Sequence, residues 1–248
     1  SHFIARDWSA RRLTMDIQIL LAQVEATDAF GELAPPMQIA ILLGALSFAT
    51  AALVSLTAFT RIIIVLSFVR RALSTTEIPP NQVMLGLSFF LTLFVMAPTL
   101  EAINTRGVQP YLAAQQSEGT APEFGITELV TVATEEIRRF MTVHTRGNDL
   151  QLFVDLANLP ETTIAEETPL KVLIPAFIIS ELKTAFIMGF CIYIPFLLID
   201  LVISTILMSL GMMMMPPVIV STPCKLLLFV LVDGWQLISK ALVSSFVI

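Results

Sequence analysis

Residues 201–224 read LVISTILMSLGMMMMPPVIVSTPC, a stretch without a charged side chain. Its centre combines four methionines with two prolines: Met212, Met213, Met214, Met215, Pro216 and Pro217. Each proline lacks an amide hydrogen and clashes with the preceding helical turn, so a helix cannot run through this point. Methionine is flexible and polarisable, and a helix break in apolar surroundings is tolerated where it is buried in protein or lines a cavity. The stretch predicts either a deformable constriction in a membrane-associated conduit or methionines that fill an irregular gap between helices.

The composition is that of an integral membrane protein. Of 248 residues, 56% are hydrophobic and 14% are charged, and the mean hydropathy is +0.83, whereas soluble domains are about 25% charged and about 45–50% apolar. Cys191 and Cys224 lie in apolar runs, which favours buried, inert thiols. The two histidines, His2 and His144, cannot form a metal site by themselves. The sequence contains no phosphate-binding loop or nucleophile motif, so we expect no metal, no cofactor and no enzymatic activity.

Two apolar regions predict two helical hairpins. The first covers residues 37–100, and Pro35-Pro36 suits the start of its first arm. A membrane helix needs about 20 apolar residues, which both arms supply. The second hairpin covers residues 172–248 and contains the Met-Pro break and a C-terminal helix. Residues 1–36 form an N-terminal segment of mixed polarity, which we interpret as the remnant of a processed signal or a cloning scar.

A polar block, residues 101–171, separates the hairpins. It holds eleven acidic and five basic residues and so carries the whole net charge of −6. Apolar residues at three- and four-residue spacing predict helices over 126–143 and 149–157, the first of them starting from residues 125–128. We interpret the block as a small helical domain. Nucleic acid binding needs basic patches, so this acidic surface argues against it.

The charges of the loops predict the orientation in the membrane. The connection within the first hairpin carries Arg70 and Arg71, and positively charged loops remain in the cytoplasm. The acidic block then faces outward, into the periplasm of a Gram-negative cell.

Ionisable residues interrupt the apolar runs at Arg61, Glu181, Asp200 and Lys225. A charged residue at membrane depth is costly and marks a functional site by default. We expect Glu181 or Asp200 to pair with Lys225 across the second hairpin. For Glu181 and Lys225 we favour such pairing over side chains that snorkel to water, because apolar residues extend on both sides of each.

Several strings of sequence together resemble the FliP family of the flagellar type III export gate. They include FTRIIIV at 59–65, PPNQV at 79–83, SELKTAF at 180–186, IPFLLIDLV at 194–202 and LFVLVDGW at 228–235. With the Met-Pro stretch, the resemblance covers residues 45–248. The related injectisome proteins are similar, so a virulence-type export gate is the alternative.

The resemblance implies an all-α, membrane-associated fold. Two apolar helical hairpins would flank a small extracytoplasmic helical domain, and copies of the chain would oligomerise into a helical pore ring. The implied location is the bacterial inner membrane, in the flagellar basal body, with the acidic domain on the periplasmic side. Family members bury their hairpins largely against each other, and a helix that is apolar all round lies in protein or in lipid. Both placements of the hairpins therefore stay open.

The resemblance also implies partners and residue roles. The partners are FliQ and FliR homologues, further copies of the chain, FlhB and FlhA of the export apparatus, membrane lipid and unfolded flagellar subunits. The residues Met212–Met215 would form a gasket that seals the resting pore. Glu181 and Lys225 are expected to lock neighbouring helices in the closed assembly, and Phe140 and Arg61 to pack between subunits.

Two other classes of protein fit the sequence less well. A small-solute transporter would also use broken helices, but it would need an inverted repeat and a polar substrate site beside the break, and we find neither. An intramembrane enzyme would need a nucleophile or paired carboxylates at helical spacing, whereas Glu181 and Asp200 are 19 residues apart.

Overall fold

A computed structural model describes residues 34–75, 78–116, 125–159, 168–212 and 215–246 of the protein. Every regular element in these ranges is a helix, which agrees with the all-α fold expected from the sequence. In chain order the helices are α2 (Pro35–Leu56), α3 (Phe59–Ala72), α4 (Asn81–Ile103), the π-helical turn η1 (Asn104–Val108), α5 (Gln109–Gln116), α6 (Ile126–His144), α7 (Gly147–Leu156), α8 (Leu170–Ser209), α9 (Pro217–Leu231) and α10 (Gly234–Ser244).

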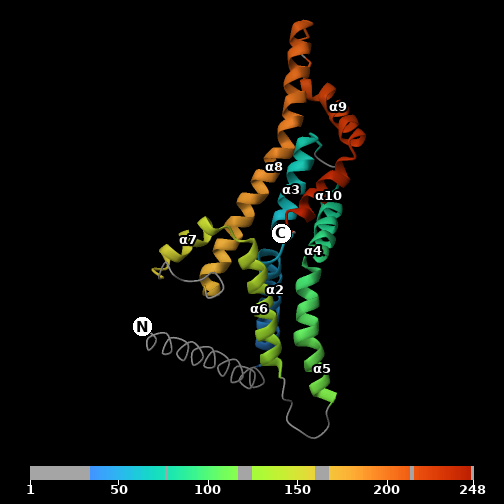
Figure 1. Ribbon diagram of the computed structural model, residues 1–248. Helices are drawn as coiled ribbons and strands as arrows, with labels where there is room; N and C mark the ends of the chain where they lie inside the picture. The colour runs from blue at the N-terminus through green and yellow to red at the C-terminus, as the bar shows by residue number, and fades with distance from the viewer. Residues whose placement is uncertain (1–33, 76–77, 117–124, 160–167, 213–214, 247–248) are drawn as a thin grey trace.

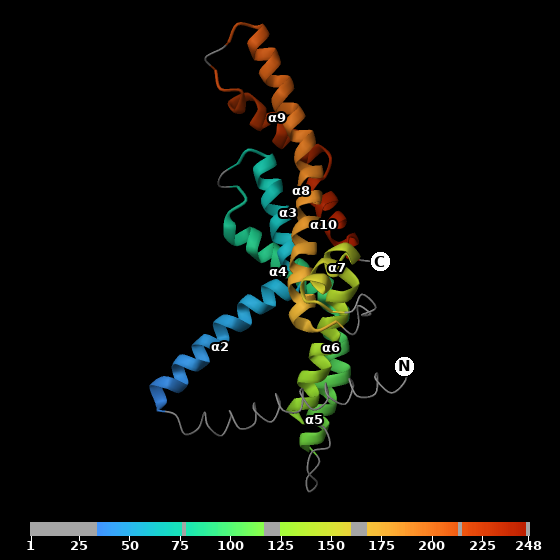
Figure 2. The ribbon, with the colours of Figure 1, turned by 90° about the vertical axis from the view of Figure 1, so that its left-hand side faces the viewer.

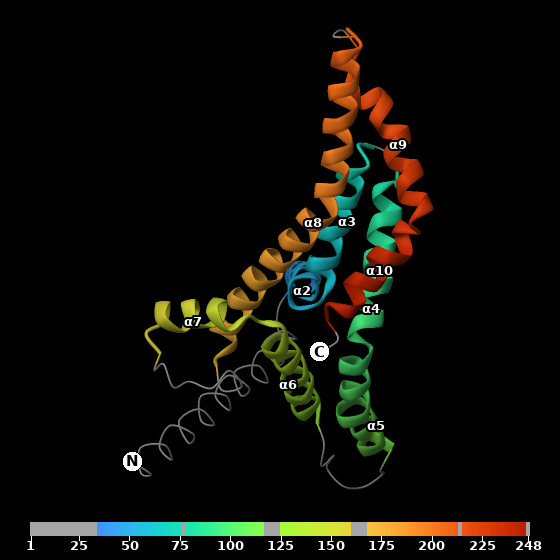
Figure 3. The same ribbon diagram turned by 45° about the horizontal axis from the view of Figure 1, so that its top comes forward.

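The 40-residue helix α8 is the spine of the fold (Figure 1). At 1.5 Å per residue it is about 60 Å long. It passes Pro175 and Pro195 without ending, and Figure 3 shows it bending along its length, as single prolines cause. Helices α3, α6, α7 and α9 all pack on it. The second predicted hairpin therefore consists of one long arm and a shorter, bent return through α9 and α10.

The first arm of the first hairpin is divided into two helices. As predicted, α2 starts at Pro35-Pro36, but the apolar run does not continue as one helix. Thr57 adopts an extended backbone, with φ −117° and ψ 178°, and α3 begins two residues later. Figure 2 shows α2 leaving α3 at a steep angle. Neither proline nor glycine marks this break, so the uniform apolar run concealed it.

The second arm of this hairpin extends past its predicted end at Leu100. Helix α4 continues through η1 and α5 as far as Gln116, so the polar block begins within a helix. In η1, a Cβ added to Gly107 would come within 2.8 Å of Leu129 Cδ1 on α6. The glycine therefore permits a close approach between α6 and the extended helix.

The polar block contains both helices that its apolar spacing predicts. Helix α6 matches the prediction over 126–143 to within one residue, and the Glu128 carboxylate accepts a hydrogen bond of 2.8 Å from the Gly125 amide at its start. Helix α7 matches the prediction over 149–157 to within two residues. Both helices pack on α8. The division of the chain into domains stays a prediction, since these helices share buried side chains with α8.

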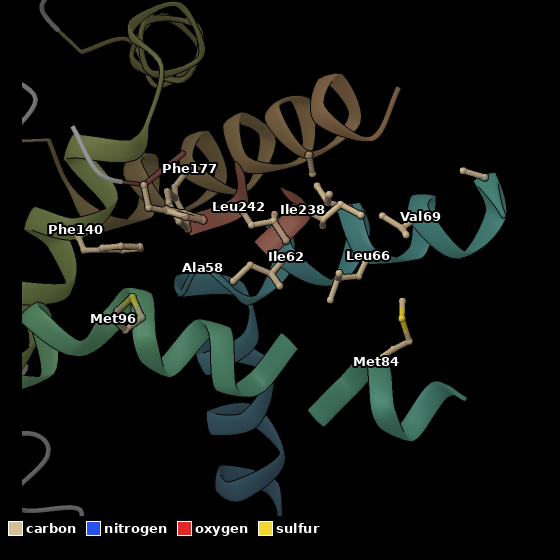
Figure 4. Close-up of a cluster of buried hydrophobic side chains, with 14 of the residues drawn as sticks. Ala58, Ile62, Leu66, Val69, Met84, Met96, Phe140, Phe177, Ile238 and Leu242 are labelled. Carbon is tan, nitrogen blue, oxygen red and sulfur yellow. The ribbon is translucent and has the colours of Figure 1, made fainter. Parts of the chain in front are cut away.

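The core is centred on the contact between α3 and α8, with α4, α6 and α10 around it (Figure 4). Phe68 of α3 lies over Gly189 of α8, where an added Cβ would come within 2.5 Å of the ring. Phe186 and Phe190 flank the same ring, with centroids at 5.6 and 5.5 Å. The core residues labelled in Figure 4 are Ala58, Ile62, Leu66, Val69, Met84, Met96, Phe140, Phe177, Ile238 and Leu242.

Within the described ranges, two helical stretches are long and apolar enough to cross a membrane, Asn81–Gln115 and Leu170–Ser209. The pair α9 and α10, bent by 65°, makes a third if it counts as one span. The chain itself buries only 22% and 11% of the most apolar parts of the two long stretches. Their surfaces are therefore suited to cover from lipid or from other subunits.

Candidate functional site

The helix break at the Met-Pro stretch separates α8 from α9 (Figure 1). Helix α8 ends at Ser209, and Gly211 adopts the left-handed conformation, with φ 77°. The Met212 amide donates to the Leu207 carbonyl at 3.0 Å, and the Gly211 amide donates to the Met208 carbonyl at 3.1 Å. These two hydrogen bonds are the Schellman closure of a helix end, for which glycine is the favoured residue. The chain thus leaves α8 at a fixed point directly before the methionines.

The methionines of the loop that the structure describes lie at the surface of the isolated chain. Met212 is 44% exposed and Met215 is 37% exposed, while Met213-Met214 lie outside the described residues. Pro216-Pro217 form the start of α9, where a missing amide hydrogen costs nothing. The loop is therefore fixed by a glycine turn on one side and by prolines on the other, with flexible thioethers between them.

A buried lysine connects this hairpin to the α3–α4 connection. Lys225 of α9 is 2% exposed, and its ammonium donates to Asp200 Oδ2 at 2.5 Å and to Ser74 Oγ at 2.7 Å. Ser74 has the left-handed φ of 56°. Of the two acidic partners that the sequence left open for Lys225, the structure places Asp200 beside it.

Arg61 and Glu181 form a second buried ion pair, between α3 and α8. Arg61 is 3% exposed and Glu181 is fully buried. Arg61 Nε donates to Glu181 Oε2 at 2.8 Å, and Nη2 donates to Oε1. Such a bidentate arrangement uses the planar fork of the guanidinium. The remaining Nη1 donates to the Ser245 carbonyl and hydroxyl at 2.9 and 3.0 Å, and the guanidinium lies 3.7 Å from the centre of the Phe246 ring.

The other alternative, a pair between Glu181 and Lys225, is excluded by the structure. The 19 residues between Glu181 and Asp200 correspond to about 28 Å along α8. Lys225 lies beside Asp200 and therefore cannot reach Glu181. Arg61 takes that place instead.

Comparison with known proteins identifies the family. A profile of the FliP family matches residues 42–242. The chain belongs to the FliP family. It is 50% identical over 210 residues to the flagellar biosynthetic protein FliP of Bacillus subtilis, covering 85% of this chain and 91% of the relative. The corresponding protein of Pectobacterium carotovorum is 51% identical over 210 residues, or 85% and 78% of the two chains. That of Aquifex aeolicus is 42% identical over 218 residues, or 87% and 88%.

Two residues of this FliP-family chain that are expected to pack between subunits make contacts within the chain itself. Phe140 is 7% exposed, and its ring contacts Phe177 and Phe246 within the chain. Arg61 is buried by its own ion pair. Both side chains therefore contribute to the fold of one subunit, and their packing between subunits stays a prediction.

Sequence reasoning missed the residues that complete these buried networks. Ser74, Ser245 and Phe246 lie near helix ends and carry no pattern of their own, and His144 was considered only as a metal ligand. Within the ranges that the structure describes, no three His, Cys, Asp or Glu side chains cluster as metal ligands would.

Proposed function

We propose that this FliP-family chain is a pore-forming subunit of the flagellar type III protein export gate. The chain is a component of flagellar biosynthesis and protein export, with helices suited to a membrane. In the proposed gate, several copies assemble with FliQ and FliR homologues into a helical ring through which unfolded flagellar subunits pass. The observation that carries the proposal is the Met-Pro loop, which exposes thioethers at the junction of two apolar helices.

In the proposed mechanism, the methionine loops of neighbouring copies meet and close the pore. A seal made of Met212–Met215 needs no fixed rotamer pattern, because thioether side chains adapt their shape and remain apolar. It can yield to an unfolded chain and close again behind it. The Gly211 turn and Pro216-Pro217 hold the ends of the loop, so the seal deforms while α8 and α9 keep their direction.

The exposed apolar faces of the hairpin support assembly with other subunits. Along α8 and α9, Leu198, Leu201, Leu227 and Leu231 are each more than half exposed in the single chain. Burying one such side chain contributes about 1.5–3 kcal/mol. A ring of copies with FliQ and FliR homologues would cover many of them at once, and lipid would cover the remainder.

The proposed location is the flagellar basal body in the bacterial inner membrane. The connection that carries Arg70 and Arg71 would lie on the cytoplasmic side, and the acidic block, residues 101–171, on the periplasmic side. FlhB and FlhA are the further proposed partners, and unfolded flagellar subunits are the proposed cargo.

The experiment that tests the proposal measures ion leakage through the resting gate. The chain is purified with its FliQ and FliR homologues, and native mass spectrometry first verifies one large hetero-oligomer with several copies. Replacing Met212–Met215 by alanine should raise the resting conductance in planar bilayers, because alanine is too short to close the pore. The matched control is Met208→Ala, which removes an exposed methionine from α8 itself. Equal resting conductance in the two variants would refute the gasket, and a chain that ignores its partners would refute the gate.

A further inference from the structure

Two charged side chains of the second hairpin have no partner among the residues that the structure describes. Between residues 172 and 246 the sequence has six charged side chains. Four of them take part in ion pairs: Glu181 with Arg61, Lys183 with Asp149, and Asp200 with Lys225. The other two, Asp233 and Lys240, are exposed, and neither side chain forms an ion pair or hydrogen bond in the described part of the chain. These two remaining charges have opposite sign.

Asp233 lies at the corner where α10 turns away from α9, a bend of 65° (Figure 3). It occupies the N-cap position of α10, where an aspartate side chain normally accepts a hydrogen bond from an amide of the first turn. Here its backbone is left-handed, with φ 51° and ψ 49°, and the side chain makes no such bond. A left-handed backbone is unfavourable for a residue with a Cβ. The corner therefore keeps this carboxylate free of the helix that it starts.

Asp233 and Lys240 lie on one face of α10. Seven residues make two helical turns, so the two positions share a face and are about 10.5 Å apart along the axis. Leu237 lies between them and is 62% exposed, whereas Ile238 and Leu242 on the other side of the helix are buried. Ion pairs within a helix join residues three or four apart. The two charges therefore do not neutralise each other within one helix.

The surroundings of this charged face are apolar. Leu231 and Val232, before the corner, are 72% and 53% exposed, and Trp235, after it, is 41% exposed. A charged side chain that faces lipid is costly. Across a contact between proteins, two charges of opposite sign can instead satisfy each other and fix the register of the contact. The face of α10 is therefore better suited to a protein partner than to lipid.

We propose that Asp233 of one copy pairs with Lys240 of the next copy in the assembly. The face carries both charges, so a second copy of the chain supplies the complementary one. The two α10 helices then run parallel, displaced along their axes by about 10.5 Å, with a Leu237 side chain on either side of the ion pair. Different ends of the face meet, so the contact is head-to-tail, and repeated head-to-tail contacts can close into a ring. The contact rests on the proposed assembly of several copies, but not on the Met-Pro loop as a seal.

Removing the two charges separately and together tests the pair, in the complex purified as for the conductance experiment. Asp233→Asn keeps a residue that tolerates a left-handed backbone, and Lys240→Gln keeps most of the length of the side chain. Each change leaves the other charge unpaired, so the protein concentration at which half of the oligomer dissociates, followed by native mass spectrometry, should rise about tenfold.

The double variant has no unpaired charge, so its oligomer should be at least as stable as that of either single variant. The matched control is Lys171→Gln, which removes an exposed lysine outside this face and should assemble like the wild type. Additive losses of about a hundredfold in the double variant would overturn the pair. So would single variants that assemble as well as Lys171→Gln.

Carbodiimide cross-linking of the wild-type complex covers the case in which a variant does not fold. This reagent joins a carboxylate directly to the amine with which it pairs. Peptides that link Asp233 to Lys240 should occur in products larger than one chain and be missing from the single chain. Each copy offers both ends of the face, so these products should form a ladder beyond the dimer.

The outcomes separate the contact from the gate. If the hetero-oligomer is intact but these linked peptides are missing, the contact is overturned while the proposed gate stands. Products that stop at the dimer would overturn the contact as well, because an antiparallel pair of α10 helices uses both ends at once. A wild-type chain that forms no hetero-oligomer would refute the gate itself.

Discussion

The stability of the protein should depend strongly on the charge of Glu181. Glu181→Gln keeps the size of the side chain but removes the charge that balances Arg61, which is 3% exposed. Removing one partner of a buried ion pair costs about 3–5 kcal/mol. Glutamine still accepts one hydrogen bond through its amide oxygen, so we expect the lower end, about 3 kcal/mol. For a chain of this size, that lowers the midpoint of thermal unfolding by roughly 6–12 °C.

Replacing both partners separates the charge from the packing. Arg61→Met together with Glu181→Leu leaves no unpaired charge, and such replacements are often close to neutral. The Ser245 carbonyl still loses its donor, which costs about 1–3 kcal/mol. The double variant should therefore be at least as stable as Glu181→Gln alone, although it changes two buried residues.

The assay is thermal denaturation of the purified chain in mild detergent, with loss of the monodisperse species as the readout. The matched control is Lys183→Gln on the same helix. Its side chain is 51% exposed and lies 3.6 Å from the largely buried carboxylate of Asp149. A glutamine amide can still donate to that carboxylate, so we expect the replacement to cost about 1 kcal/mol. If Glu181→Gln unfolds within about 2 °C of Lys183→Gln, the argument that Glu181 balances a buried guanidinium is wrong.

Two further predictions use the same assay. Asp200→Asn should cost about 1–2 kcal/mol, less than Glu181→Gln, because Asp200 is a third exposed although its partner Lys225 is buried; a loss equal to that of Glu181→Gln would contradict this ranking. Gly189→Ala should cost about 1–3 kcal/mol, since the new Cβ would come within 2.5 Å of the Phe68 ring. Gly86→Ala, with nothing within 4 Å of its Cβ, should be neutral or stabilising by up to about 1 kcal/mol; equal stability of the two glycine variants would contradict the close approach of α3 and α8.

The sequence predicts helix ends well where a few neighbouring residues determine them. The start of α2 at Pro35-Pro36, the start of α6 after Gly125 and the break before Pro216-Pro217 each depend on a missing amide hydrogen, a cap or a ring clash. The break at Thr57 has no such local cause, because α3 turns there to pack along α8, whereas α2 contacts α8 far less extensively. Pro175 shows that a proline alone does not determine a helix end, because α8 continues through it while packing against neighbouring helices.

Buried charges show the same division between local and long-range information. Apolar surroundings identify Glu181 and Lys225 as unusual from sequence alone. Their partners depend on which helices lie side by side. Asp200 and Lys225 are joined through one turn, so their pairing follows from the hairpin. Arg61 and Glu181 are 120 residues apart, and only the docking of α3 on α8 brings them together.

Helix α8 is too long to lie wholly within the core of a bilayer. At about 60 Å it is twice the thickness of a bilayer core, about 30 Å. The first part of α8 is surrounded by other helices of the chain. Seven of the ten buried residues of α8 lie between Val172 and Ala185, where the helix packs against α3, α6 and α7. Residues 186–209 span about 36 Å and are mostly exposed and apolar. Both parts have a similarly high hydropathy, because hydropathy depends on residue type and not on what each part of the helix contacts. The first part belongs mainly to the core of the chain. The second part keeps one side against α3 and α9, and its exposed side matches a bilayer or a neighbouring helix, with the Met-Pro loop at its far end.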